Sequence, residues 1–170
     1  MPAILKEFRV EQLQAAQIIG RKISCKFGHP DGNPIGDFWS RCLQDGTMQK
    51  LQSFEAIREP VPAFGWIGNF DHAAKTFDYV VAALTTAADA RPFEGAVSIQ
   101  LPALRYAIGT IEGSIPEIFS AAPALVGGEL EKRGLRRSAT PDFEMEAYDQ
   151  RFQHGAETTI IEFWVPLAIG

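Results

Sequence analysis

The sequence predicts an α+β fold made of two similar halves, with a cleft where the halves join. The first observation is that the order strand-strand-helix-strand-strand, read from apolar periodicity, occurs twice along the 170 residues. The second is a match between short segments of the two halves: residues 76–81 align with 160–165, which places Asp78 beside Glu162. Each half is too small for a full core, so we expect the two to pack face to face. The join between them is the natural place for a ligand.

In the first half, one helix is marked by apolar residues at helical spacing, from Ile35 to Leu43. Trp39 and Cys42 lie on this apolar stripe and are assigned to packing. Gly46 ends or interrupts the helix, and a short second helical turn is expected after it. Gly20 indicates a β-bulge in the second strand. The strands expected here are 8–12, 15–25, 63–70 and 77–84, with a linker at 87–92.

In the second half, Ser114-Ile-Pro-Glu117 has the form of a capping box with proline in the first turn of a helix. Pro123 predicts a kink or a restart of that helix, and Gly134 is a suitable C-terminal stop. The two repeats are expected at about 6–86 and 94–168 of a single domain. The strands expected in this half are 96–101, 104–111, 142–149 and 158–167.

The last hairpin contains the acidic and aromatic residues expected to bind a ligand. Side chains alternate faces along a strand, so Glu146 shares a face with Tyr148, and Glu162 shares one with Trp164. If the strands pair with those faces together, two carboxylates and two aromatic rings line one surface. Carboxylates among apolar rings are costly to desolvate unless they are compensated, and a cationic, partly aromatic ligand would compensate them. The alternative is a solvated sheet face with acids at its rim.

Composition excludes several classes of function. Lys and Arg number 16 and Asp and Glu number 21, a net charge of −5, so direct nucleic-acid binding is disfavoured. Cys25 and Cys42 form no disulfide framework and indicate a reduced, intracellular protein. The three histidines lie far apart, and neither a metal site nor a cofactor is expected. No signal peptide and no membrane-spanning run is evident, so a cytoplasmic location is expected.

Four segments carry a family resemblance: Leu101-Pro-Ala-Leu-Arg-Tyr-Ala, Ser114-Ile-Pro-Glu117, Glu146-Ala-Tyr-Asp-Gln-Arg-Phe152 and Ile161-Glu-Phe-Trp-Val-Pro-Leu167. They resemble the GyrI-like effector-binding domains, which occur at the C-terminus of AraC-type and MerR-type bacterial transcription activators and as stand-alone proteins. The resemblance is clearest over residues 96–168 and weaker over the first half. No upstream helix-turn-helix is expected, because the chain begins near its first strand, and this puts a direct role as a transcription factor in doubt.

The resemblance implies a pseudo-twofold duplication of a β-α-β-β unit, with antiparallel sheets around a central ligand cleft. It also implies that the cleft binds lipophilic, often cationic, small molecules, with acids that neutralise the ligand and aromatic rings that stack on it. Carried over by position, the acids fall on Glu146 and Glu162. The aromatic contacts expected are Tyr148, Trp164, Trp66, Tyr79, Phe119 and Tyr106. The helical region departs from the family pattern at Pro123 and at Gly127-Gly128, and both changes reshape one wall of the cleft.

Three functions are consistent with this reading. The first is a small-molecule binder, acting as a sensor or a sequestering module for a cationic aromatic compound, with a regulatory protein as a further partner. The second is a hydrolase in which Glu146 or Glu162 acts as base or nucleophile, if burial raises its pKa. The third is a protein-interaction module such as a gyrase modulator, driven by acidic surface.

Overall fold

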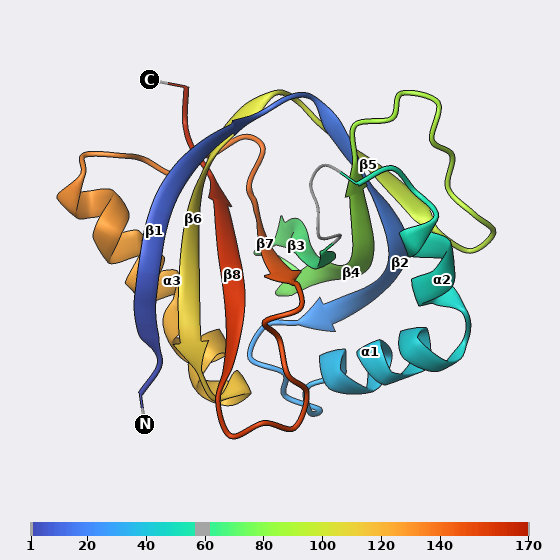
Figure 1. The fold of residues 1–170 in the computed structure, drawn as a ribbon, viewed down its shortest axis with the longest axis horizontal. Helices are drawn as coiled ribbons and strands as arrows, with labels where there is room; N and C mark the ends of the chain where they lie inside the picture. Colours follow the sequence, from blue (N-terminus) through green and yellow to red (C-terminus); the bar gives the residue numbers. More distant parts are fainter. Residues whose placement is uncertain (1, 57–61, 170) are drawn as a thin grey trace. The chain divides into compact units, whose positions relative to one another are not determined.

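A computed structural model describes residues 2–56 and 62–169 of the chain. Within these residues it contains eight strands and three helices, which confirms the predicted α+β class (Figure 1). The chain divides into two compact units. Unit 1 comprises residues 1–13 and 103–170, and unit 2 comprises residues 14–102.

Unit 1 is a four-stranded antiparallel sheet with one helix packed on it. The strands lie in the order β1-β6-β8-β7. Figure 1 shows α3 alongside β1 and β6, and its apolar side chains share a core with alternate residues of β6 and β8. The elements are β1 (Ile4–Leu13), β6 (Leu104–Gly113), α3 (Ile115–Lys132), β7 (Phe143–Tyr148) and β8 (Thr159–Pro166).

Helix α3 begins at the predicted capping box. The backbone N–H and the hydroxyl of Ser114 both donate to the Glu117 carboxylate, at 3.3 and 2.7 Å. The restart predicted at Pro123 is wrong, because the helix runs uninterrupted through it. Burial of Ala122 and Val126 on either side of this proline stabilises the helix enough to outweigh the missing N–H donor.

Unit 2 contains four antiparallel strands, in the order β3-β4-β2-β5. Its helices α1 and α2 are separated at Gly46, whose φ of 85° is left-handed. Their apolar faces share a core with Tyr79 and Val81 of the sheet. The elements are β2 (Ala16–Lys26), α1 (Ile35–Gln44), α2 (Thr47–Gln52), β3 (Ala63–Asp71), β4 (Thr76–Thr85) and β5 (Val97–Leu101).

The bulge predicted at Gly20 is wrong, since the pairing of β2 with β4 runs through this residue without a register shift. The glycine has a different purpose. A Cβ atom there would overlap the backbone carbonyl of Val81, so Gly20 lets two strands approach closely.

Each unit contains one strand from the other half of the sequence. The order β-β-α-β-β does occur twice, but β1 pairs with β6 and β5 pairs with β2. The compact units therefore differ from the sequence repeats at 6–86 and 94–168 by the exchange of their first strands. Both sheets have the same topology: the exchanged strand lies at one edge, followed by the second, fourth and third strands of a repeat.

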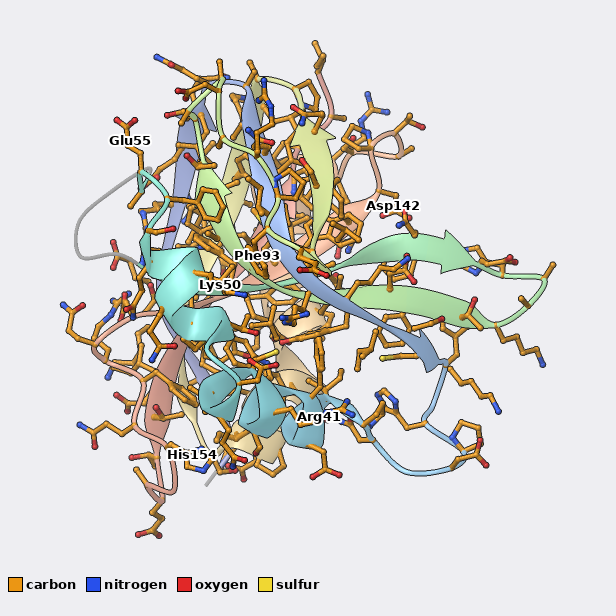
Figure 2. All side chains as sticks on the ribbon, turned by 90° about the vertical axis from the view of Figure 1, so that its right-hand side faces the viewer. Arg41, Lys50, Glu55, Phe93, Asp142 and His154 are labelled. Carbon is orange, nitrogen blue, oxygen red and sulfur yellow. The ribbon has the colours of Figure 1, made fainter. Side chains whose placement is uncertain are left out.

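The segment expected to be a linker, residues 87–92, lies within unit 2 and connects β4 to β5. Phe93 follows it and lies near Lys50 (Figure 2), with its ring centroid 5.2 Å from Lys50 Nζ. The same centroid is 5.5 Å from the guanidinium carbon of Arg21. The side-chain amide of Gln17 donates to the carbonyls of Ala87 and Ala90 at 3.0 and 3.2 Å. These contacts fasten the connection to the sheet.

Candidate functional site

Glu162 and Trp164 lie on the face of the unit 1 sheet opposite α3. Their neighbours in β8, Ile161 and Phe163, belong to the core that α3 covers, and side chains alternate along the strand. The register of β6 with β8 adds Thr110, which lies directly opposite Glu162. We refer to this surface as the face opposite α3; its members are Arg9, Tyr106, Ile108, Thr110, Phe143, Met145, Glu162 and Trp164.

The prediction that Glu146 and Tyr148 share this surface is wrong. In the last hairpin Ala147 pairs with Glu162, and Glu146 pairs with Phe163. Glu146 and Tyr148 therefore lie on the α3 side of the sheet, where the Tyr148 hydroxyl donates to Glu146 at 2.6 Å. A shift of one residue in the pairing is sufficient to reverse the face of every side chain in a strand.

The alternative of a solvated face with acids at its rim is also wrong, because both carboxylates are buried. Glu162 is 3% exposed and Glu146 is 7% exposed. A buried carboxylate must be hydrogen-bonded or paired to be tolerated. The surroundings of Glu162 meet this requirement within unit 1.

Two guanidinium groups and an indole hold the Glu162 carboxylate. Its Oε1 accepts hydrogen bonds from Arg9 Nη2 at 3.1 Å and from Arg151 Nη2 at 2.9 Å. Its Oε2 accepts one from Trp164 Nε1 at 3.0 Å. Charge-assisted bonds of this kind are short and strong in a water-poor environment. The carboxylate is thereby compensated by the chain itself in the free protein.

Both arginines have a second acidic partner. Arg9 donates to Glu11 at 2.6 Å, and Arg151 donates to both oxygens of Asp149. Burial works against the charge of Arg9, but its bonds to Glu11 and Glu162 outweigh burial and raise its pKa. The pKa of Arg151 is raised chiefly by its bond to Asp149 and further by its bond to Glu162. Both side chains therefore remain charged.

Aromatic rings lie beside the carboxylate on the same face. The Tyr106 ring is 5.6 Å from the Trp164 ring and 6.2 Å from the Phe143 ring, between centroids. Burial raises the pKa of the Tyr106 hydroxyl, which keeps it neutral. A buried acid and a group of three rings are thus brought together on one face of one sheet.

Of the other predicted contacts, Tyr79 and Trp66 belong to unit 2 and Phe119 belongs to α3. Tyr79 belongs to the core beneath α1 and α2 in unit 2, where its hydroxyl accepts a hydrogen bond from Trp39 Nε1 at 2.8 Å. Trp66 is buried in β3 and lies on the opposite face of that sheet from Tyr79. Phe119 is 39% exposed on α3. Within unit 1, Phe119 is therefore on the α3 side of the sheet, whereas Glu162 is on the other side.

Sequence reasoning missed four residues around Glu162: Arg9, Thr110, Phe143 and Arg151. Arg9 lies in the exchanged strand β1, so its pairing with the second half could not be read from local pattern. Phe143 was within the predicted hairpin, and its alternation with Met145 was the available signal. Arg151 lies in the connection between β7 and β8, and periodicity carries no information there.

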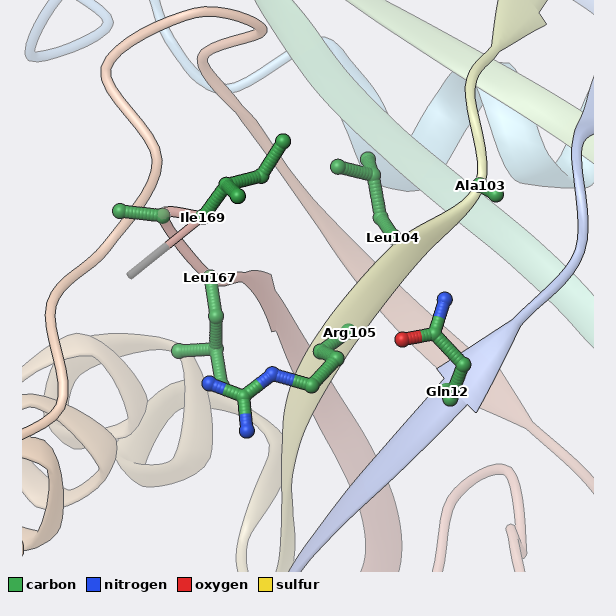
Figure 3. A pocket seen from close by; sticks show the side chains of 7 residues that line it. Gln12, Ala103, Leu104, Arg105, Leu167 and Ile169 are labelled. Atoms are coloured by element: carbon green, nitrogen blue, oxygen red, sulfur yellow. The ribbon is translucent and has the colours of Figure 1, made fainter.

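A separate pocket of about 390 Å³ lies at the end of the unit 1 sheet, next to the C-terminal residues (Figure 3). It contains none of the predicted site residues. Its lining is Gln12, Ala103, Leu104, Arg105, Leu167, Ala168 and Ile169. In unit 2 a second pocket of about 260 Å³ adjoins Gln17 and the start of the connection to β5. Across residues 2–56 and 62–169, no helix combines the length and the apolar character needed to cross a bilayer.

Residues 9–167 match the family described as Cass2, integron-associated effector binding protein. The chain belongs to this family. Membership confirms the resemblance to GyrI-like effector-binding domains and identifies a small-molecule-binding domain. The match extends over both units and includes Arg9, Arg151 and Glu162.

Relatives of this effector-binding chain include transcription regulators. The transcriptional regulator BrlR of Pseudomonas aeruginosa is 27% identical over 160 residues, which are 94% of this chain and 54% of the regulator. The chain thus spans about half the length of this curated relative.

Among solved structures, SAV2435 bound to tetraphenylphosphonium has the same fold, with a TM-score of 0.72 and 19% identity over 95% of this chain and 94% of that one. The integron cassette protein VCH_CASS2 from the Vibrio cholerae metagenome aligns with a TM-score of 0.59 and 12% identity, over 98% of this chain and 99% of that one.

Proposed function

We propose that the chain binds a lipophilic organic cation on the face opposite α3, with Glu162 as the countercharge and Trp164 and Tyr106 as aromatic contacts. The observation that carries the proposal is the Glu162 carboxylate, which is almost fully buried and already has cationic groups as its partners. A site that recognises guanidinium groups has the charge and geometry for an external cation.

The ion pairs of Glu162 support a cationic ligand. The carboxylate pairs with Arg9 and Arg151, which also pair with Glu11 and Asp149. A ligand cation would pair with the same carboxylate. At an effective dielectric near 20, such a pairing gains a few kcal/mol, and a good cation–π contact adds roughly 0.5–2 kcal/mol.

The comparison with SAV2435 supplies a probe. That protein, which shares the fold, is bound to tetraphenylphosphonium, a permanent cation surrounded by four aromatic rings. A ligand of this type matches an acid beside aromatic side chains. We further propose that the chain serves as a sensor or a sequestering module, since BrlR, about twice as long, is a transcriptional regulator.

The test is calorimetric titration of the protein with tetraphenylphosphonium and with neutral triphenylphosphine oxide. Glu162→Gln removes the charge but keeps the shape. We expect it to weaken binding of the cation by about tenfold or more, which corresponds to roughly 1.4 kcal/mol, and to change binding of the neutral compound by less than about twofold.

Glu146→Gln is the matched control, because Glu146 is also buried but lies on the α3 side of the sheet. We expect it to leave both affinities unchanged. Equal losses for the cation and the neutral compound in Glu162→Gln would show that the acid is not the countercharge. A selective loss of cation binding in Glu146→Gln would move the site to the α3 side.

A further inference from the structure

The two arginines on Glu162 are held in different ways. Arg9 projects from β1, which pairs with β6 along nearly its whole length, and its side chain is 24% exposed. Arg151 lies in the connection between β7 and β8, and its side chain is 36% exposed. The strand position fixes Arg9, whereas a residue in a surface connection can move at lower cost.

Arg151 would keep most of its bonds if it left Glu162. Its Nε donates to Asp149 at 3.0 and 3.2 Å, and its Nη2 donates to Asp149 at 2.7 Å. The bond from Nη2 to Glu162 is one more, at 2.9 Å. Leaving Glu162 would therefore cost the Arg151 side chain one of these four hydrogen bonds.

We propose that Arg151 is an internal cation that occupies Glu162 in the free protein and is displaced when a cationic effector binds. The inference rests on the proposed function. The effector cation then takes the place of the Arg151 guanidinium beside the Glu162 carboxylate. Arg9 stays and holds the carboxylate in position. The affinity of the free protein is then lowered by the cost of displacing Arg151.

Displacement also gives effector binding a structural consequence. The connection that carries Arg151 continues to Phe152, whose ring packs at 5.0 Å on the Tyr148 ring, and to Gln153, whose N–H donates to Thr159 Oγ1 at 2.7 Å. Release of Arg151 from Glu162 loosens a contact between this connection and the face opposite α3. The dynamics of residues 150–158 then depend on whether the effector is bound.

The test compares the wild-type protein with Arg151→Gln and Arg137→Gln, using tetraphenylphosphonium as the probe. Arg137 is the matched control, because it belongs to unit 1 and forms ion pairs with Asp142 and Glu144 rather than with Glu162. Both variants lose one positive charge. We expect Arg151→Gln to bind the probe about fivefold more tightly, and Arg137→Gln to bind within about twofold of the wild type.

Amide hydrogen exchange distinguishes the displacement of Arg151 from a simple change in the electrostatic potential at Glu162. In the wild type and in Arg137→Gln, the probe should speed exchange in residues 150–158. In Arg151→Gln, exchange there should be fast already and unaffected by the probe. Slower or unchanged exchange in the wild type on binding would overturn the inference, as would equal or weaker binding by Arg151→Gln. Absence of probe binding by all three proteins would instead overturn the proposed function and this inference with it.

Discussion

Ala147 of β7 lies directly opposite Glu162 of β8. This pairing places the two buried glutamates of the last hairpin on different faces of the unit 1 sheet. Glu162 is left with Trp164, Tyr106 and two arginines, while Glu146 has the Tyr148 hydroxyl on the α3 side. One register position therefore decides which acid is available to a ligand on the face opposite α3.

Replacement of Trp164 by leucine should weaken binding of both tetraphenylphosphonium and triphenylphosphine oxide. The change removes an aromatic face but keeps an apolar side chain, so the loss should be about three- to tenfold for the cation by calorimetry. Phe119→Leu, on the exposed surface of α3, should leave both affinities unchanged. Unaltered binding by Trp164→Leu would show that Trp164 does not contact the ligand. Weaker binding by Phe119→Leu would show that Phe119 on α3 does.

Thr110→Val should stabilise the protein. The Thr110 side chain is 4% exposed, and its Oγ1 has no hydrogen-bond partner among the described residues. Replacing an unsatisfied hydroxyl by a methyl group of similar size should raise the free energy of unfolding by about 1 kcal/mol in urea titrations. Thr85→Val is the matched control, since the Thr85 hydroxyl accepts the Ala87 N–H at 3.1 Å, and it should lower the free energy of unfolding by a similar amount. A loss of stability in Thr110→Val would show that its hydroxyl is paired in solution.

The fold was largely predictable because its signals are local. Apolar spacing at Ile35, Phe38 and Cys42 located α1, and the capping box at Ser114 located the start of α3. The alternation that marked β8 depends only on neighbouring residues. Helices and strands are therefore recovered within a few residues of their observed bounds.

The pairing of those strands could not be predicted. The side-chain period of a strand is two, so the pattern alone is compatible with a register in which Glu146 faces Glu162 and with the observed one. The exchange of β1 and β5 depends on pairing between strands that are far apart in the sequence. This pairing brings Arg9 to Glu162. The acid and aromatic residues of β8 were thus foreseen, but the basic partners that balance the acid were not.

Gly20→Ala should be strongly destabilising. The added methyl group would overlap the backbone carbonyl of Val81, which cannot move without disrupting the pairing of β2 with β4. We expect a loss of roughly 3 kcal/mol in the free energy of unfolding. Gly36→Ala provides the contrast, because a Cβ atom there meets nothing within 4 Å, and it should stabilise α1 by up to about 1 kcal/mol. Similar effects of the two substitutions would contradict the close approach at Gly20.

Ser114→Ala should reduce stability in a pH-dependent way. The hydrogen bond from the Ser114 hydroxyl holds the pKa of the Glu117 carboxyl below its usual value. A lowered pKa contributes stability that is complete above the ordinary glutamate value of about 4.3 and is lost as the pH falls through the lowered pKa. The difference in unfolding free energy between the wild type and the variant should therefore be larger at pH 7 than at pH 3. An equal difference at both values would show that the hydroxyl does not bond the ionised carboxylate.

The most direct measurement for the account is a crystal structure of the chain with tetraphenylphosphonium. We expect the phosphorus atom on the face opposite α3, next to the Glu162 carboxylate and within about 6 Å of an aromatic ring centroid. A ligand bound against Glu146 and Tyr148 on the α3 side, with Glu162 still closed by both arginines, would contradict it.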